Sequence, residues 1–212
     1  MTGLVRKATL LTVAGLVAAS ASFAGVPSPA NSSVPACVPL VGSSLGVVDP
    51  AGLITITVRD LANNPLSGAS VVIDASGASD IAICADQLDA AALVNCAAKT
   101  TRKFTNALGQ VTFTVLGGSN GAGNASSLVN AGKIYANGVL LGSPTLTAFD
   151  LDGGGGVGAN DLSAWLSDFG TLNPYGRSDY DCSGAVGAND LSVWLSLFGN
   201  LASGESCVTA CP

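Results

Sequence analysis

Extended hydrophobic runs alternate with clusters of turn-forming residues between Val26 and Phe149. The run 53–60 is rich in β-branched residues and repeats every second position, which predicts a strand. Segment 63–68 (Asn-Asn-Pro-Leu-Ser-Gly) is dense in turn formers, and 69–74 resumes the extended pattern. The two runs are therefore predicted to form a hairpin.

Further strands are predicted at 99–104, 110–116, 133–136, 139–141 and 145–149, with only 85–93 competing as a short helical turn. Strands that recur without long helical patterns indicate a mainly β protein, an antiparallel β-sandwich whose inner faces carry alternating apolar residues. The predicted core residues are Ile54, Ile56, Val58, Val71, Ile73, Val111, Phe113 and Val115.

The first 24 residues are typical of a secretory signal. Arg6 and Lys7 precede an apolar run over 8–19, and the small residues around Ala24 offer a cleavage site before Gly25. The run is shorter than the roughly 20 residues that a bilayer span needs. We expect a secreted chain without a membrane span, divided into a sandwich (25–148), a small module (149–200) and a cysteine-bearing tail (201–212).

Charge and composition exclude several functions. Removing the signal takes away two of the eight basic residues and none of the fourteen acidic ones, so the net charge of −6 becomes about −8, which disfavours nucleic acid as a partner. The chain has no histidine, which excludes histidine-based catalysis and histidine-ligated zinc. We expect a non-catalytic protein. The carboxylates of an alternative hydrolase would be Asp74, Asp80, Asp86 or Asp89, but no catalytic motif surrounds them and turn capping is their simpler role.

Six cysteines follow the signal, an even number that predicts disulfides in an oxidising compartment. They are Cys37, Cys84, Cys96, Cys182, Cys207 and Cys211. Fifteen connectivities are possible for six cysteines. Proximity along the chain favours Cys84 with Cys96, and Cys182 with Cys207 or Cys211.

An internal repeat carries the clearest chemical signal. The segment 158–170 (GANDLSAWLSDFG) recurs as 187–199 (GANDLSVWLSLFG), and each copy follows an acidic, glycine-containing stretch, 150–157 or 179–186. Calcium takes six to eight oxygens, and a twelve-residue loop supplies them from positions 1, 3, 5, 7 and 12, with glycine at position 6 for a sharp turn.

Both stretches fit this spacing, so two calcium ions are predicted. The candidate ligands, by side chain or by main-chain carbonyl, are Asp150, Asp152, Gly154, Gly156 and Asp161 in the first loop and Asp179, Asp181, Ser183, Ala185 and Asp190 in the second. Gly154 has no side-chain oxygen at position 5, so the second site is expected to bind more tightly.

A helix is predicted after each loop. Leu162, Trp165, Leu166 and Phe169 fall at helical spacing, as do Leu191, Trp194, Leu195 and Phe198. The two stripes are expected to pack on each other as the core of a small domain. Gly170 and Gly199 stand where helix C-terminal glycines are expected.

Two resemblances follow from these motifs. The frame ITVRDLANNPLSGASVVI, followed downstream by TNALGQVTFTV, resembles a bacterial immunoglobulin-like domain. The duplicated loop, with Asp161 and Asp190 rather than glutamate at position 12 before a leucine-bearing helix, resembles a dockerin module. The second resemblance implies a cohesin-like partner, bound in two orientations related by a half-turn through Ala159, Asn160, Ser163, Ala188, Asn189 and Ser192.

Together these patterns predict a secreted, calcium-binding adhesion or assembly protein at the cell surface, docked to a cohesin-like or other surface protein. An extracellular polysaccharide is a further candidate ligand. Two alternatives stay open: a self-associating filament or surface-layer subunit, and a carbohydrate-active enzyme or carbohydrate-binding accessory protein.

Overall fold

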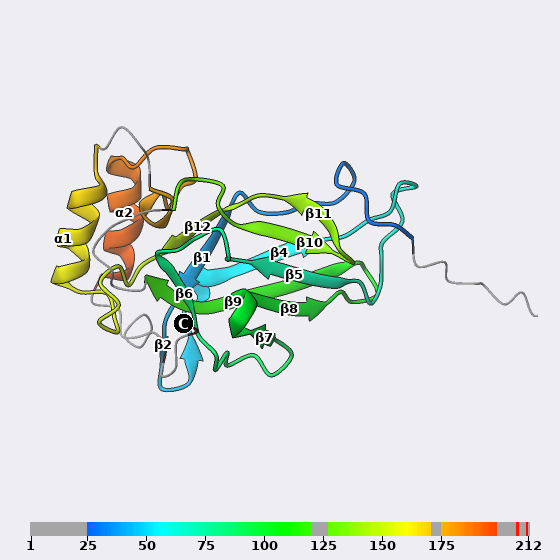
Figure 1. Ribbon diagram of the computed structural model, residues 1–212, viewed down its shortest axis with the longest axis horizontal. Helices are drawn as coiled ribbons and strands as arrows, with labels where there is room; N and C mark the ends of the chain where they lie inside the picture. Colours follow the sequence, from blue (N-terminus) through cyan, green and yellow to red (C-terminus); the bar gives the residue numbers. More distant parts are fainter. Residues whose placement is uncertain (1–24, 120–126, 171–174, 199–206, 208–210, 212) are drawn as a thin grey trace, which may run out of the picture.

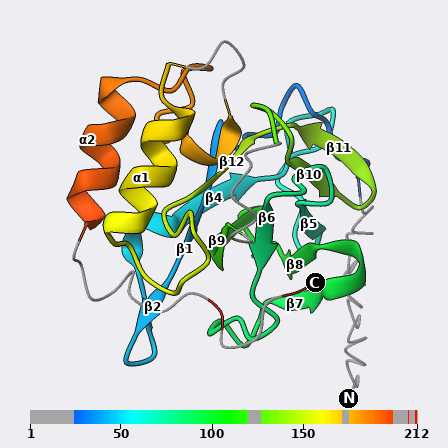
Figure 2. The ribbon, with the colours of Figure 1, turned by 60° about the vertical axis from the view of Figure 1, so that its left-hand side comes forward.

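The computed structural model describes residues 25–119, 127–170, 175–198, 207 and 211. The expected signal 1–24, Gly199 and all of the tail except Cys207 and Cys211 lie outside the described residues. β-Strands dominate, and the helices α1 (Ala159–Asp168) and α2 (Ala188–Leu197) lie side by side at one end of the molecule (Figures 1 and 2). The predicted mainly β class is confirmed.

The first sheet has the strand order β12-β1-β9-β4, with β6 paired to the far end of β9. Its strands are β12 (Thr145–Ala148), β1 (Cys37–Val41), β9 (Gln110–Ser119), β4 (Leu53–Thr57) and β6 (Ile81–Ile83). Strand β1 runs parallel to both of its neighbours, whereas β4 and β6 are antiparallel to β9. The sheet is therefore mixed, and the prediction of a wholly antiparallel arrangement is wrong here.

The second sheet is antiparallel, in the order β11-β10-β5-β8-β7. Its strands are β11 (Val139–Gly142), β10 (Lys133–Ala136), β5 (Ser70–Asp74), β8 (Thr100–Phe104) and β7 (Leu93–Asn95). A small hairpin of β2 (Ser43–Ser44) and β3 (Val47–Val48) stands apart, and three short 3₁₀ turns, η1 (Pro50–Gly52), η2 (Cys96–Ala98) and η3 (Gly176–Ser178), complete the elements.

The predicted hairpin of 53–60 with 69–74 does not form. Strand β4 pairs with β9 in the first sheet, whereas β5 pairs with β8 and β10 in the second, so the turn at 63–68 carries the chain from one sheet to the other. A period of two predicts which face of a strand is buried, but it does not determine the neighbouring strand.

Both sheets contribute to one hydrophobic core. Every predicted core residue is buried, from Ile54 on β4 to Val115 on β9. The same core continues into the loop-helix segment through residues such as Phe149, Trp165 and Trp194. The helices at the end of the molecule are therefore packed onto the β-sheets.

The predicted helical turn over 85–93 is absent. This segment consists of bends and a turn, and Gln87 satisfies it by side-chain hydrogen bonds to β9. The Gln87 amide donates to the carbonyls of Cys84 and Leu116 and accepts from the Leu116 amide, each at 2.9 Å. A side chain thus replaces the backbone pairing that would have continued β6.

Three disulfides form, as predicted, but the favoured pairings are wrong. The bonds join Cys37 with Cys182, Cys84 with Cys207, and Cys96 with Cys211. Each spans more than 100 residues, because the fold brings the C-terminal residues back to the β-sheets: the Cys211 amide donates to the Ile83 carbonyl at 2.7 Å. Nearness along the chain was a poor guide to nearness in space. Within the described ranges, no helix is long and apolar enough to cross a membrane.

Candidate metal centres

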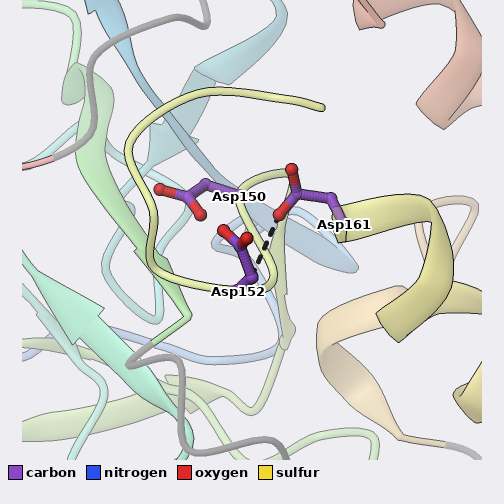
Figure 3. A group of neighbouring side chains, drawn as sticks. All are labelled: Asp150, Asp152 and Asp161. Atoms are coloured by element: carbon purple, nitrogen blue, oxygen red, sulfur yellow. Dashed lines mark hydrogen bonds between the residues drawn. The ribbon is translucent and has the colours of Figure 1, made fainter. Parts of the chain in front are cut away.

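The first candidate site lies between the end of β12 and the start of α1. Asp150 and Asp152 project from the loop, and Asp161 projects from the first turn of α1 toward them (Figure 3). One oxygen of each of these three carboxylates lies within 4.8 Å of the others. Asp150 and Asp161 are buried, and Asp152 is half-buried. The three acidic positions of the predicted loop thus converge.

The glycine at position 6 has the conformation that the spacing requires. Gly155 has a φ of 81° and its counterpart Gly184 has a φ of 88°, a left-handed region that disfavours residues with a Cβ. Gly170 also adopts a left-handed φ of 70° directly after α1, as a helix C-terminal glycine should. The sequence prediction is confirmed at these positions.

Backbone amides orient the carboxylates of the first loop. Asp150 accepts from the amides of Gly153 and Gly155, at 2.8 and 3.1 Å. Asp161 Oδ1 accepts from both Leu151 and Asp152, at 2.6 and 2.9 Å, while Oδ2 accepts from Gly158 at 2.6 Å. A carboxylate oxygen has about two acceptor positions. Oδ2 is therefore the Asp161 oxygen with capacity left for a cation.

The second site repeats this geometry between η3 and α2. Asp179, Asp181 and Asp190 each bring a carboxylate oxygen within 4.8 Å of the others. Asp179 accepts from the amides of Ser183 and Gly184, both at 3.0 Å, and Asp190 Oδ2 accepts from Gly187 at 2.7 Å. The duplication in sequence is therefore a duplication in structure.

Two differences separate the loops. Ser183 offers a hydroxyl at position 5, which donates to the Ala185 carbonyl at 3.2 Å, whereas Gly154 has no side chain there. Of the described amides, only that of Asp181 reaches Asp190 Oδ1, at 3.0 Å. The second loop thus has one more oxygen donor, and its position-12 carboxylate keeps acceptor capacity on both oxygens.

Burial and repulsion shift the pKa of several of these carboxyls. Burial raises the pKa of Asp161 against the opposing hydrogen bonds from backbone amides, and the nearby charge of Asp152 adds to the rise. Burial likewise raises the pKa of Asp179, reinforced by repulsion from Asp190 and Asp181. The exposed Asp181 has a lowered pKa, chiefly because the Ser183 side chain hydrogen-bonds to it. A raised pKa means that folding disfavours the charged form, a cost that a bound cation would offset.

Residues beyond the loops fasten both sites to the β-sheets. The ring of Tyr180 stacks on that of Phe149 with centroids 4.7 Å apart, and its hydroxyl donates to the Ala148 carbonyl at 2.9 Å. The indole of Trp194 donates to the Phe149 carbonyl at 3.3 Å. In the first loop, the Ser119 amide at the end of β9 donates to the Asp150 carbonyl at 2.7 Å.

A buried ion pair connects the two repeats. Arg177 donates through Nε and Nη2 to the two carboxylate oxygens of Asp168, at 2.8 and 3.1 Å, and the Ser178 hydroxyl donates to the same carboxylate at 2.6 Å. Asp168 ends α1, and Arg177 lies two residues before Asp179. Sequence reasoning missed this pair, although a signal existed: Arg177 is the sole basic residue of 149–200, and Asp168 replaces the leucine found at the same place in the second repeat.

The predicted helix stripes are only partly buried. The buried face of α1 contains Asp161, Trp165 and Asp168, and that of α2 contains Asp190, Trp194 and Leu197. The other large residues of the predicted stripes are half-buried or exposed: Leu162 and Leu191 pack partly against the core, while Leu166, Phe169, Leu195 and Phe198 are 57, 49, 50 and 48% exposed. The prediction that the stripes pack on each other is therefore wrong, because the position-12 carboxylate turns the buried face by one residue.

The candidate partner-binding residues all lie on the surface. Ala159, Asn160, Ser163, Ala188, Asn189 and Ser192 are exposed at the starts of the two helices. Both serine hydroxyls donate back to their own helix, to the carbonyls of Ala159 and Ala188, at 3.2 and 3.1 Å.

The carboxylates considered for a hydrolase are spread over the β-rich part. Asp74 and Asp89 cap turns, accepting from the amides of Ser76 and Ala91 at 2.8 and 2.9 Å. Asp80 is buried and accepts from the Ser127 amide at 3.3 Å, and Asp86 is exposed. Among the described residues, the metal-ligating side chains that converge are those of the two calcium-type loops.

Comparison of the chain with protein-family models, with curated proteins and with solved structures finds no match.

Proposed function

We propose that this chain is a secreted, non-catalytic adhesion or assembly protein that binds two calcium ions in its repeated loops. The observation that carries the proposal is that two triads of aspartates, 29 residues apart in sequence, converge in the same way at positions 1, 3 and 12. A single acidic cluster is common on protein surfaces. Two matching clusters with matching amide contacts and left-handed glycines favour a binding role.

The donor set favours calcium over other metals. Each site offers carboxylate oxygens and main-chain carbonyls, which are hard ligands suited to calcium and magnesium. Soft or nitrogen ligands are lacking, because the sequence has no histidine and the six cysteines are paired in disulfides. Glycine-rich loops also suit the larger, more tolerant coordination shell of calcium better than the strict octahedron of magnesium.

The finer fold assignment belongs to the same proposal. Two sheets with a shared core support an immunoglobulin-like sandwich, and the paired loop-helix units support a dockerin-like module. In this interpretation Asp150, Asp152, Asp161 and the carbonyls of Gly154 and Gly156 face the first ion. The second ion is held by Asp179, Asp181, Ser183, Asp190 and the Ala185 carbonyl.

The helices would form the docking surface. Their exposed residues are apolar or uncharged, and the two repeats present nearly the same set, so a partner can bind in either of two orientations. We propose a cohesin-like or other cell-surface protein as this partner. Support comes from the four exposed apolar side chains of Leu166, Phe169, Leu195 and Phe198, since clustered exposed apolar surface is typical of interaction sites.

Calorimetric titration tests the calcium proposal directly. The full chain is expected to take up two calcium ions, Asp161→Asn to retain only the second, and Asp190→Asn only the first, because each substitution removes the charged ligand that closes one loop. The matched control is Asp86→Asn, which removes the same charge from an exposed position outside the loops. Absence of calcium uptake at millimolar concentration would rule the proposal out. Sedimentation of the calcium-loaded chain separates a monomeric docking protein from the self-associating alternative.

A further inference from the structure

The second calcium-type loop contains a cysteine that is bonded to a distant strand. Cys182 is the fourth residue of this loop, between Asp181 and Ser183, and its disulfide partner Cys37 begins β1, 145 residues earlier. The bond therefore joins the ligand-bearing loop covalently to the first sheet. This inference rests on the calcium function proposed above and concerns how the second of those sites is controlled.

The first loop provides an internal comparison. Its fourth residue is Gly153, which has a φ of 70°, and Cys182 has a φ of 53° at the same place. Both loops thus need a left-handed residue here, but only glycine adopts that conformation readily. A cysteine in this conformation needs support from the surrounding structure, and the disulfide to β1 supplies it.

The bond is also the most accessible of the three. Cys37 and Cys182 are both half-buried, and the loop residues on either side of Cys182 are exposed. Each of the other two disulfides includes a fully buried cysteine, since Cys84 is 1% and Cys211 3% exposed. A reductant in solution therefore reaches the bond in the loop more readily than the other two.

We infer that the Cys37–Cys182 disulfide is a redox control on the second calcium site. A dithiol reductant supplies the electrons: one of its thiolates attacks a sulfur of the disulfide, and its second thiol resolves the mixed disulfide. The products are two cysteine thiols and the oxidised cyclic disulfide of the reductant. The released loop no longer holds Asp181 and Ser183 in ligating positions, so calcium affinity falls at this site. The first site, without a cysteine, keeps its affinity.

Thermodynamic linkage gives the converse effect. If the intact disulfide strengthens calcium binding by a given factor, calcium binding stabilises the disulfide against reduction by the same factor. A calcium-rich environment would thus keep the second loop oxidised and loaded, and a reducing, calcium-poor environment would release it.

The test compares two disulfide deletions in the full chain. Cys37→Ser with Cys182→Ser is expected to weaken one of the two calcium sites by about tenfold, within the usual range of coupling between sites, and to leave the other unchanged in a calorimetric titration. The matched control is Cys96→Ser with Cys211→Ser, which removes a disulfide outside both loops and should leave both affinities unchanged. Two unchanged sites in the first variant would overturn the inference, whereas an unmodified chain that binds no calcium would overturn the calcium function itself.

A second measurement needs no variant. The unmodified chain is equilibrated with dithiol redox buffers, with and without calcium, and the reduced cysteines are alkylated and assigned by mass spectrometry. Calcium is expected to lower the midpoint potential of Cys37–Cys182 by about 30 mV, the two-electron equivalent of a tenfold change, and to leave Cys96–Cys211 unchanged. An unchanged midpoint in a chain that does bind calcium would overturn the inference.

Discussion

At the residue scale, the most unusual feature is a charged pair inside an otherwise apolar junction. The side chains of Arg177 and Asp168 are 1 and 3% exposed, and Arg177 also reaches the Ser119 hydroxyl on β9 at 3.4 Å. Burying two charges is costly, and the pair compensates through close, two-point geometry. Removing one partner leaves the other charge buried and unneutralised.

This pair yields a prediction for stability. Arg177→Met or Asp168→Leu alone is expected to lower the free energy of unfolding by about 3–5 kcal/mol, because each leaves a buried charge uncompensated. The double variant is expected to recover most of that loss, since leucine already occupies the corresponding buried position, Leu197, in the second repeat. Urea denaturation in saturating calcium measures all three. If the double variant lost as much as the two single variants added together, the charges would not be acting as a pair.

At the element scale, each helix after a loop has a buried edge centred on its tryptophan and an exposed edge beside it. In α1 the boundary falls between neighbouring residues, with Trp165 1% and Leu166 57% exposed. This follows from the loop: Asp161 must face the other carboxylates, and residues four and seven positions later then face inward.

The two neighbours should therefore respond very differently to truncation. Trp165→Ala is expected to cost about 3–5 kcal/mol of unfolding free energy, as large buried side chains do. Leu166→Ala should change it by no more than about 0.5 kcal/mol, because exposed side chains contribute little. Denaturant unfolding with calcium present provides the measurement, and Trp194 and Leu195 form an independent second pair in α2. Equal losses at the two neighbours would contradict the assigned faces.

Sequence reasoning succeeded where local spacing determines the structure. The alternation in Ile54, Ile56 and Val58 predicted the buried face of β4, and the loop spacing predicted which aspartates converge. It failed where the outcome depends on distant partners. Strand β1 was missed because Pro39 argues against a central strand. The structure accommodates this proline because pairing with β9 begins only at Leu40.

At the scale of the whole molecule, the loops and the sheets share one core. Phe149, at the end of β12, stacks on Tyr180 of the second loop and accepts a hydrogen bond from Trp194 of α2. The end of β9 is bonded to the first loop through the Ser119 amide. Ligand binding at the loops should therefore stabilise the sheets as well.

Removing calcium is thus expected to lower the melting temperature of the entire molecule in a single transition. Saturation at one hundred times the dissociation constant contributes about 2.7 kcal/mol for each site, so chelation should produce a shift of several degrees. Differential scanning calorimetry with calcium and with a chelator measures the effect, and magnesium serves as the control cation. Two separate transitions, with only the smaller one sensitive to calcium, would show that the loops unfold independently of the sheets.

The place of β1 has a consequence for the order in which the molecule assembles. This strand is the first in the sequence, yet its parallel neighbours β9 and β12 come from the middle and the end of the β-rich part. Chains dominated by such distant pairings acquire their native structure slowly, in milliseconds to seconds. During synthesis the N-terminal segment would remain without its sheet partners until more than one hundred later residues had emerged.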